Sequence, residues 1–197
     1  MKKLLLTSSF LLILFSVNAQ ETEVEVDSNH FYWTEDAKLK WSDFHGKVEE
    51  GSNLAALATM ALPYKFETDN ESNIDFTIQV YFIKSESWAK KEEENDLLLK
   101  HQQLHFDIAE LHRRKVVKKL INSEINSDNY RATLKQIVGR YWGDEYPKMQ
   151  NQYDDDSNFS QNIKGQIDWM KFVNKELEKL KEYQATNFIL NLNNSDE

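Results

Sequence analysis

The sequence predicts an α+β fold, in which a small antiparallel or mixed sheet is followed by one long helix and two further helices. Two patterns support this prediction. Over residues 74–82 apolar residues alternate with polar ones, which is the period of a half-buried strand. From residue 87 onward the apolar residues recur every three or four positions, which is the period of a helix with one buried face. Strands first and helices after are typical of an α+β domain.

Residues 1–19 have the three parts of a secretory signal peptide: Lys2 and Lys3, an apolar run over 4–17, and a small-residue cleavage site that ends at Ala19. We therefore expect cleavage after Ala19 and a secreted or periplasmic product. The apolar run is shorter than the roughly 20 residues that a membrane-spanning helix needs, and no later stretch is apolar enough to cross a bilayer. The sequence contains no cysteine, so neither a lipid anchor on cysteine nor a disulfide is expected.

The remaining chain has the length of one domain that can bury its own core. We expect a flexible, polar lead-in over 20–29, a single domain over 30–184 and a polar tail over 185–197. The net charge of −9 disfavours binding to nucleic acid or to anionic membranes. A basic cluster over 113–119 is the one feature that could favour binding to a polyanion. Its position at the end of a predicted helix instead favours a role in complementing the helix dipole.

The predicted sheet follows a segment rich in aromatic residues. That segment contains 31–33 and 39–46, and Gly46 marks a turn at its end. The first strand is expected over 54–66, which is rich in small and apolar residues, and the second over 74–82. The five tryptophans of the chain lie among apolar positions, and we expect them to serve mainly as core residues.

Three helical regions are expected after the sheet. The first runs over 87–121, with Ser87 as its N-cap, acidic residues in its first turns and the basic cluster at its end. The second runs over 128–152 and should bend near Gly143 and Pro147. The third runs over 161–183, where apolar residues recur at helical spacing.

Residues 101–105 read His-Gln-Gln-Leu-His. Two histidines four positions apart lie about 40° apart around a helix and roughly 6 Å apart along it, so both rings can bind one metal ion. The zinc-protease motif His-Glu-x-x-His has the same spacing, and its glutamate is the general base that takes a proton from water. Gln102 stands at the position of that glutamate, and its amide cannot accept a proton at neutral pH. The sequence thus combines a candidate metal pair, His101 and His105, with the loss of the usual catalytic group.

A structural alternative for the two histidines stays open. Both lie on the apolar stripe of the predicted helix, where a histidine is often a hydrogen-bonded core residue. The rest of the stripe consists of aliphatic residues: Leu97, Leu98, Leu104, Ile108 and Leu111.

The motif helix, together with the segment 39–46, resembles a family of predicted secreted zinc-dependent proteases that is catalogued as a domain of unknown function. The resemblance covers most of the chain from Trp33 to Trp169. The helix of that family usually reads His-Glu-Gln-x-His-Phe-Asp-Ile-x-Glu, and every specified position except Gln102 matches in this sequence: His101, Gln103, His105, Phe106, Asp107, Ile108 and Glu110. The resemblance implies a zincin-like fold and a zinc cofactor.

The downstream segment of the family commonly reads Tyr-Asp-x-x-Thr-x-His, followed by a glutamine and a tryptophan. The corresponding residues here are 153–159, then Gln166 and Trp169, and Phe159 stands where the family has its histidine. If that histidine is the third zinc ligand of the family, this chain has lost the ligand as well as the general base. Two such losses at separate positions favour an abandoned active site.

Another side chain could still supply a third ligand. Asp154 is the main candidate, since the acidic residues 154–156 could approach from a downstream loop, although a solvated acidic turn is the simpler interpretation. On the motif helix, His112 lies about 10 Å beyond His105 along the axis, and Glu110 points away. Asp107 is better placed to orient a neighbouring side chain than to bind the metal.

Three hypotheses for function follow from these observations. The leading one is a secreted or periplasmic, zincin-like pseudoenzyme whose peptidase activity is lost or severely reduced and which retains a binding or structural role toward a peptide or protein. The second is an active zinc-dependent peptidase or hydrolase that uses His101, His105 and an acidic residue such as Asp154. The third is a metal-free envelope protein with two ordinary core histidines. The sequence predicts no oligomeric state.

Overall fold

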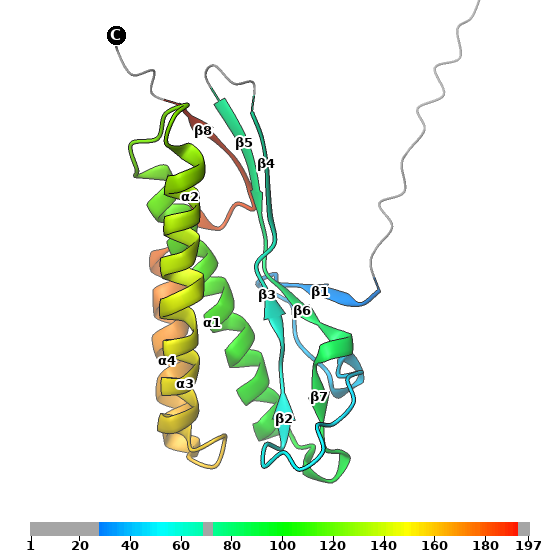
Figure 1. The fold of residues 1–197 in the computed structure, drawn as a ribbon. Coiled ribbons are helices and arrows are strands. Elements are labelled where there is room, and N and C mark those ends of the chain that lie inside the picture. The colour runs from blue at the N-terminus through cyan, green and yellow to red at the C-terminus, as the bar shows by residue number, and fades with distance from the viewer. Residues whose placement is uncertain (1–27, 69–72, 193–197) are drawn as a thin grey trace, which may run out of the picture.

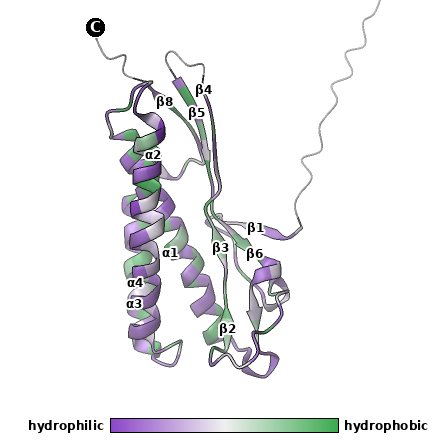
Figure 2. Cartoon of the chain, in the orientation of Figure 1, coloured by the Kyte–Doolittle hydropathy of each residue, from purple (hydrophilic) through white to green (hydrophobic). Residues whose placement is uncertain are grey.

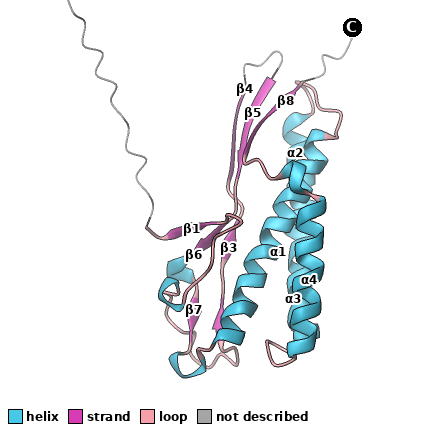
Figure 3. Cartoon of the chain, turned by 180° about the vertical axis from the view of Figure 1, so that it is seen from behind, coloured by secondary structure: helices cyan, strands magenta, loops and turns pink. Residues whose placement is uncertain are grey.

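The computed structural model describes residues 28–68 and 73–192, and in this part the chain is a mixed α+β protein with antiparallel sheets (Figure 1). The predicted α+β class is confirmed. The long helix α1 (Asp96–Ile121) lies in the middle, with the strands on one side and the helices α3 (Tyr146–Ser157) and α4 (Ile163–Lys179) on the other. The view from behind shows the same order of layers (Figure 3).

The described strands form three small antiparallel sheets. The first sheet has the order β1-β6-β3, the second pairs β2 with β7, and the third has the order β4-β5-β8. The strands are β1 (His30–Tyr32), β2 (Ala56–Leu57), β3 (Met60–Ala61), β4 (Tyr64–Thr68), β5 (Asn73–Ile78), β6 (Tyr81–Ile83), β7 (Trp88–Ala89) and β8 (Asn187–Asn191). β2 and β7 belong to the part of the sheet layer beside the first turns of α1 (Figure 1).

Both strands predicted from the sequence are shorter in the structure, because the chain passes from one sheet to another. The region 54–66 contains β2, β3 and the start of β4, while 74–82 contains most of β5 and of β6. Within β5 the alternation holds as predicted, since Ile74, Phe76 and Ile78 are buried and Asp75 is exposed. The apolar/polar alternation therefore identified which face of a strand is buried. It does not predict where the chain passes from one sheet to the next.

The helix α1 begins later than predicted. Ser87 is buried and is not an N-cap: its hydroxyl donates to the carbonyl of Ile83 and accepts from the N–H of Thr59. The actual N-cap is Asn95, whose side chain accepts from the N–H groups of Leu97 and Leu98, each at 3.0 Å. Between the two residues lie β7 and a 3-10 turn over Lys91–Glu93.

The second helical region is continuous and extends beyond the predicted end. It consists of α2 (Tyr130–Val138), a π-helical segment (Gly139–Glu145) and α3. Gly143 lies in the π segment, and Pro147 lies in the first turn of α3. From the glycine and the proline we expected a bend in this helix. The structure has a widened π turn in this region instead. The helix then continues to Ser157, so Asp154 lies in α3 and not in the loop that we expected.

Helix α4 falls within the predicted third helix, and a 3-10 turn over Lys181–Tyr183 follows it. Its N-cap is Asn162, whose side-chain oxygen accepts from the N–H of Gly165 at 3.1 Å. In Figure 2 both α3 and α4 carry hydrophilic and hydrophobic bands, as expected for helices with one buried face.

The prediction of a polar tail over 185–197 is wrong for the part that the structure describes. Residues Asn187–Asn191 form β8, which pairs along β5 with Leu190 opposite Ile74. Two of its three apolar side chains, Phe188 and Leu190, contact the core, whereas Ile189 between them is 62% exposed. The flanking asparagines obscured this strand in the sequence. Residues 193–197 lie outside the described part of the chain.

Helix α1 connects two hydrophobic clusters. Toward the sheets and α2 it contributes Phe106, Ala109, Val116, Val117 and Leu120 to the larger cluster. Toward α3 and α4 it contributes Leu104, Ile108 and Leu111 to a second cluster, which also contains Tyr153 and Val173. Because α1 has apolar partners on both sides, it is a rigid base for side chains that project from its remaining face.

The basic cluster at the end of α1 is more buried than we expected. Arg113 and Arg114 both form ion pairs with Glu110, and all three side chains are buried. Arg113 also donates to the backbone carbonyls of 183–185, and Arg114 donates to the carbonyl of Leu177. These two arginines therefore fix the end of α4 and the approach to β8 against α1, a larger role than that of complementing the helix dipole.

Among the described residues, no helix combines the length and the apolar character needed to cross a membrane. The predicted signal peptide (1–19) and all of the predicted lead-in (20–29) except Ser28 and Asn29 lie outside the described residues.

Candidate metal centre

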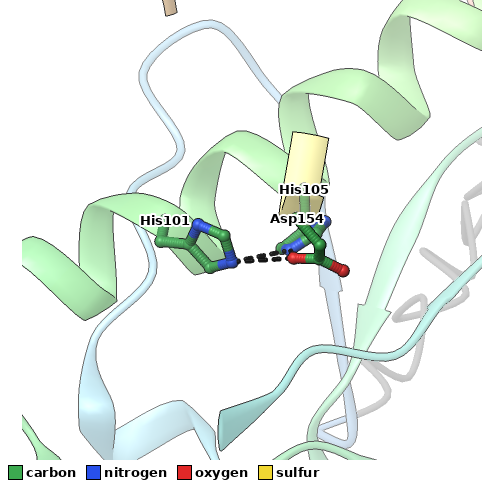
Figure 4. Close-up of side chains that lie close together, drawn as sticks. All are labelled: His101, His105 and Asp154. Atoms are coloured by element: carbon green, nitrogen blue, oxygen red, sulfur yellow. Dashed lines mark hydrogen bonds and ion pairs between the residues drawn. The ribbon is translucent and has the colours of Figure 1, made fainter. Parts of the chain in front are cut away.

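Three side chains from two helices meet beside the middle layer of the fold. His101 and His105 project from α1, and Asp154 projects from α3 (Figure 4). The Nε2 atoms of the two histidines lie 3.0 Å apart, and each lies 3.0 Å from Oδ1 of Asp154. These three atoms form a nearly equilateral triangle, and the group could hold a metal ion.

The hydrogen bonds of Gln150 fix the tautomer of His105. The side-chain N–H of Gln150 donates to the backbone carbonyl of His105 at 3.2 Å, so the amide oxygen must face the imidazole. That oxygen lies 2.7 Å from Nδ1 of His105, which must therefore carry a proton and donate it. A neutral His105 then has a lone pair on Nε2, which is the nitrogen that faces His101 and Asp154.

His101 has a similar arrangement with a weaker partner. Its Nδ1 lies 3.5 Å from the hydroxyl of Ser157, and that hydroxyl donates to the carbonyl of Asp154. The hydroxyl oxygen can thus accept from Nδ1, which leaves a lone pair on Nε2 of His101. The ring of Tyr153 stacks on His101 at 4.6 Å between centroids and meets His105 edge-on at 4.9 Å. The tyrosine therefore holds both imidazoles in place.

With this tautomer of His101, three lone pairs converge on one small space, an arrangement that a bound cation would stabilise. A second proton on His101 is disfavoured at neutral pH, because burial lowers the pKa of His101, with His105 adding to the effect and Asp154 opposing it. A metal ion is a good match. The edges of the triangle are 3.0 Å, and a tetrahedral ion with bonds near 2.1 Å would need edges of roughly 3.4 Å. A small outward shift of the side chains is enough.

The carboxylate of Asp154 is suited to be the anionic member of the set. Burial alone would raise its pKa, but the contacts with His101 and His105 outweigh burial and hold the pKa well below its ordinary range. Asp154 therefore remains ionised at any pH at which the protein is expected to be folded. Two neutral imidazoles and one carboxylate supply two nitrogen ligands, one oxygen ligand and a single negative charge.

A cavity of about 530 Å³ opens on the three side chains. Its walls come from the region around β2, from α1, from the start and middle of α3, and from the turn after α3. The lining consists of Asn53, Leu54, Ala55, Ala56, Leu57, Ala58, Leu98, His101, Gln102, His105, Tyr146, Pro147, Gln150, Asn151, Asp154, Phe159 and Gln161. Of the described residues that line it, Asp154 alone carries a formal charge at neutral pH when both histidines are neutral. A metal ion on the three ligands would thus face a roomy space with neutral walls.

Gln102 and Phe159, two of the positions at which the chain departs from the zinc-protease pattern, both lie at this cavity. Gln102 is 3% exposed and lines it, one residue along α1 from His101. Phe159 is 48% exposed and also lines it. The third corner of the triangle belongs to Asp154 and not to Phe159. The absence of a histidine at 159 therefore does not leave the triangle incomplete.

The turn that carries Phe159 has an uncommon backbone. Asn158, Phe159 and Ser160 all have positive φ, at 46°, 50° and 74°. Each non-glycine residue in this region costs roughly 1–2 kcal/mol, so the turn is strained. It connects α3 to α4 and brings Phe159 and Gln161 to the cavity. The strain fits a turn whose shape is set by its position at a site.

Other residues singled out from the sequence do not join the cluster. Asp107 accepts from the indole of Trp33 at 2.9 Å and from the amide of Gln103 at 3.0 Å. We expected Asp107 to orient a metal ligand, but neither of the side chains that it contacts belongs to the triangle. His112 is buried, and its Nδ1–H donates to the carbonyl of Ile108. Glu110 pairs with the two arginines, which agrees with the expectation that it points away.

The sequence analysis missed the residues that support the ligands, namely Gln150, Tyr153 and Ser157. Together with Asp154 they occupy positions i, i+3, i+4 and i+7 of one helical face. This spacing was visible in the sequence. We expected the helix to end near 152, which placed the face in a loop and hid the pattern.

No protein-family model matches the chain, and neither a curated protein nor a solved structure matches it. The geometry of the site is therefore the main ground for a functional conclusion.

Proposed function

We propose that this protein is an exported, zincin-like zinc-binding protein that has lost most or all of its peptidase activity and uses its metal site to bind a peptide or protein. One observation carries the proposal: the Nε2 atoms of His101 and His105 and an oxygen of Asp154 lie at 3.0 Å from one another. The resemblance of the motif helix to secreted zinc proteases supports the zincin-like assignment, and residues 1–19 support export.

Zinc is the metal that this ligand set fits best. Two imidazoles and one carboxylate are a common protein ligand set for zinc, and such three-ligand sites keep a fourth position for a ligand from outside. The cavity of about 530 Å³ provides the space for that ligand. The hydrogen bond from His105 to Gln150 is also the kind of contact that orients a zinc-binding histidine. Calcium or magnesium would call for more oxygen ligands than these residues provide.

The same cavity lacks a group that could act as general base. Asp154 is the sole carboxylate among the described lining residues, and the proposed metal uses it. Gln102 cannot take up a proton. Burial raises the pKa of Tyr146 to about 12, with a hydrogen bond from Gln150 opposing the shift, so the phenol stays protonated. Since general-base catalysis contributes about 10²–10⁴-fold to a reaction rate, we expect hydrolysis by this chain to be severely reduced.

An active hydrolase remains the second candidate, and one observation favours it. Asp154 completes a set of three protein ligands, which is the set that catalytic zinc sites use. Bound zinc lowers the pKa of water without help from a carboxylate, so slow turnover would still be chemically feasible. The third hypothesis, a metal-free protein with two core histidines, agrees less well with the structure. Without a metal, His101 would carry its proton on Nε2 and share it between Asp154 and His105. Nε2 of His105 and Oδ1 of Asp154, both acceptors, would then remain in contact at 3.0 Å.

Metal analysis and a protease assay together test the proposal. We expect the purified protein to bind one zinc ion per chain and the His101→Ala variant to bind none. We also expect no hydrolysis of a generic protein substrate above the chelator-treated background, and a gain of chelator-sensitive hydrolysis in Gln102→Glu. Chelator-sensitive turnover by the unmodified chain would favour the active hydrolase. A native chain that binds no zinc would rule out both metal-dependent functions.

A further inference from the structure

We infer that the ligand of this site is a carboxylate, supplied either by the C-terminus of a peptide or by an acidic side chain, and not the neutral carbonyl of a peptide bond. This inference rests on the proposed zinc site and adds the chemical class of its ligand. It follows from the charge inside the cavity and from the identity of residue 102.

The cavity would carry one net positive charge when a divalent ion is bound. Its described lining contains no lysine or arginine, and its one carboxylate is Asp154. A divalent cation and one carboxylate leave a charge of +1 inside walls that are otherwise neutral. An uncompensated charge in a partly enclosed space is unfavourable, and a ligand with one negative charge removes it. A neutral carbonyl does not.

Residue 102 decides between these two kinds of ligand. A glutamate at this position would bring the cavity to neutrality by itself and would repel an incoming carboxylate. Gln102 keeps nearly the same size without the charge, and its amide carries two N–H donors that can bond to a carboxylate oxygen. The substitution that removes the general base therefore makes the site more favourable to an anion. In this account the glutamine has a function of its own and is not merely a damaged catalytic residue.

The rest of the lining suits the remainder of such a ligand. Asn151 and Gln161 add uncharged amide groups, which can pair with the backbone of a peptide. Leu54, Leu57 and Phe159 add apolar surface, and each of them is 36–48% exposed. A cavity of about 530 Å³ lies within the range that encloses a small ligand. The structure thus fits the end of a peptide chain, with its carboxylate on the metal and an apolar side chain against these walls.

Calorimetric titration of the zinc-loaded protein with three synthetic peptides tests the inference. The first peptide is acetyl-Leu-Phe with a free C-terminal carboxylate, the second is the same peptide as its C-terminal amide, and the third is acetyl-Leu-Glu amide, with its carboxylate on the side chain. We expect the C-terminal amide of acetyl-Leu-Phe to bind at least tenfold more weakly than the free acid of the same peptide. Tighter binding of the third peptide would assign a side chain as the source of the carboxylate, and tighter binding of the first would assign a peptide C-terminus. Comparable binding of the two would support the carboxylate class with either source.

Two variants of Gln102 separate charge from shape. Gln102→Glu should weaken binding of the free acid by roughly ten- to a hundredfold, because a second negative charge lies within several ångströms of the ligand. Gln102→Met has a similar size and no charge, and it should lose less affinity than Gln102→Glu, because it removes only the hydrogen bonds of the amide. The inference would be overturned if the free acid and its amide bound equally well, or if neither of the two carboxylate peptides bound. It would also be overturned if the two variants lost affinity for the free acid equally. Zinc content is measured in each sample, so a failure of the zinc site itself is recognised separately.

Discussion

The amide of Gln150 should strengthen zinc binding, although Gln150 is not one of the three ligands of the triangle. Its oxygen lies 2.7 Å from Nδ1 of His105 and its nitrogen lies 3.2 Å from the carbonyl of the same residue, so it fixes both the tautomer and the orientation of that imidazole. Removal of such a partner typically lowers metal affinity 10- to 100-fold, which corresponds to about 1.4–2.7 kcal/mol. We therefore expect Gln150→Ala to raise the zinc Kd by one to two orders of magnitude.

The assay is competition for zinc against a chromophoric chelator of known affinity, at neutral pH and constant ionic strength. Gln152→Ala is a matched control, because Gln152 lies on the same helix, is exposed and bonds to Asp156 instead of a histidine. The control should bind zinc as the native chain does. If Gln150→Ala keeps the native Kd within about twofold, or if both variants lose affinity equally, the assigned tautomer of His105 is wrong.

Three further predictions concern stability. Burial lowers the pKa of His112 to about 4 from an ordinary 6.5. Between these two pH values the unfolded chain binds a proton that the folded chain does not. The free energy of unfolding should therefore fall by about 3 kcal/mol as the pH drops from 6.5 to 4. In chelator-treated protein, urea unfolding should show a flatter pH profile for His112→Gln, and an unchanged profile would contradict the assignment. Gly165→Ala should lower the melting temperature, with a loss of roughly 1–3 kcal/mol, because the new Cβ would clash with the backbone carbonyl oxygen of Asp156. A melting temperature equal to that of the native chain would show that the turn adjusts without cost. Glu110→Gln should cost about 3–5 kcal/mol in denaturant unfolding, because it leaves the buried guanidinium of Arg113 without its charged partner; a loss below about 1 kcal/mol would mean that the ion cluster contributes little net stability.

Hydrophobic periodicity predicted the elements of this fold better than it predicted their ends. The alternation of β5 and the helical period of α1 both report a buried face, and both were recognised. The start of α1 was misplaced because Ser87 and Asn95 are both acceptable N-caps, and what decides between them is the pairing of β7 with β2. β8 was missed for a related reason. Its pairing with β5, distant in sequence, makes a strand of an asparagine-rich segment.

The candidate site was predictable in part. The spacing of His101 and His105 follows from helix geometry and needed no structure. Whether Asp154 reaches them depends on how α3 packs on α1, which no local pattern reports. The family resemblance drew attention to Phe159 as a lost ligand, yet the residue that completes the triangle stands five positions earlier in the same segment. The supporting residues were hidden because the end of α3 was predicted too early.

Zinc binding by variants of two neighbouring aspartates tests the central claim most directly. Asp154 belongs to the triangle, whereas Asp155 is exposed on the same helix turn and lies outside it. Titration with zinc followed by native mass spectrometry should show one zinc ion on the native chain and on Asp155→Ala, and none on Asp154→Ala at the same free zinc concentration. Equal zinc binding by Asp154→Ala and the native chain would contradict the account, because the triangle would then not be the metal site.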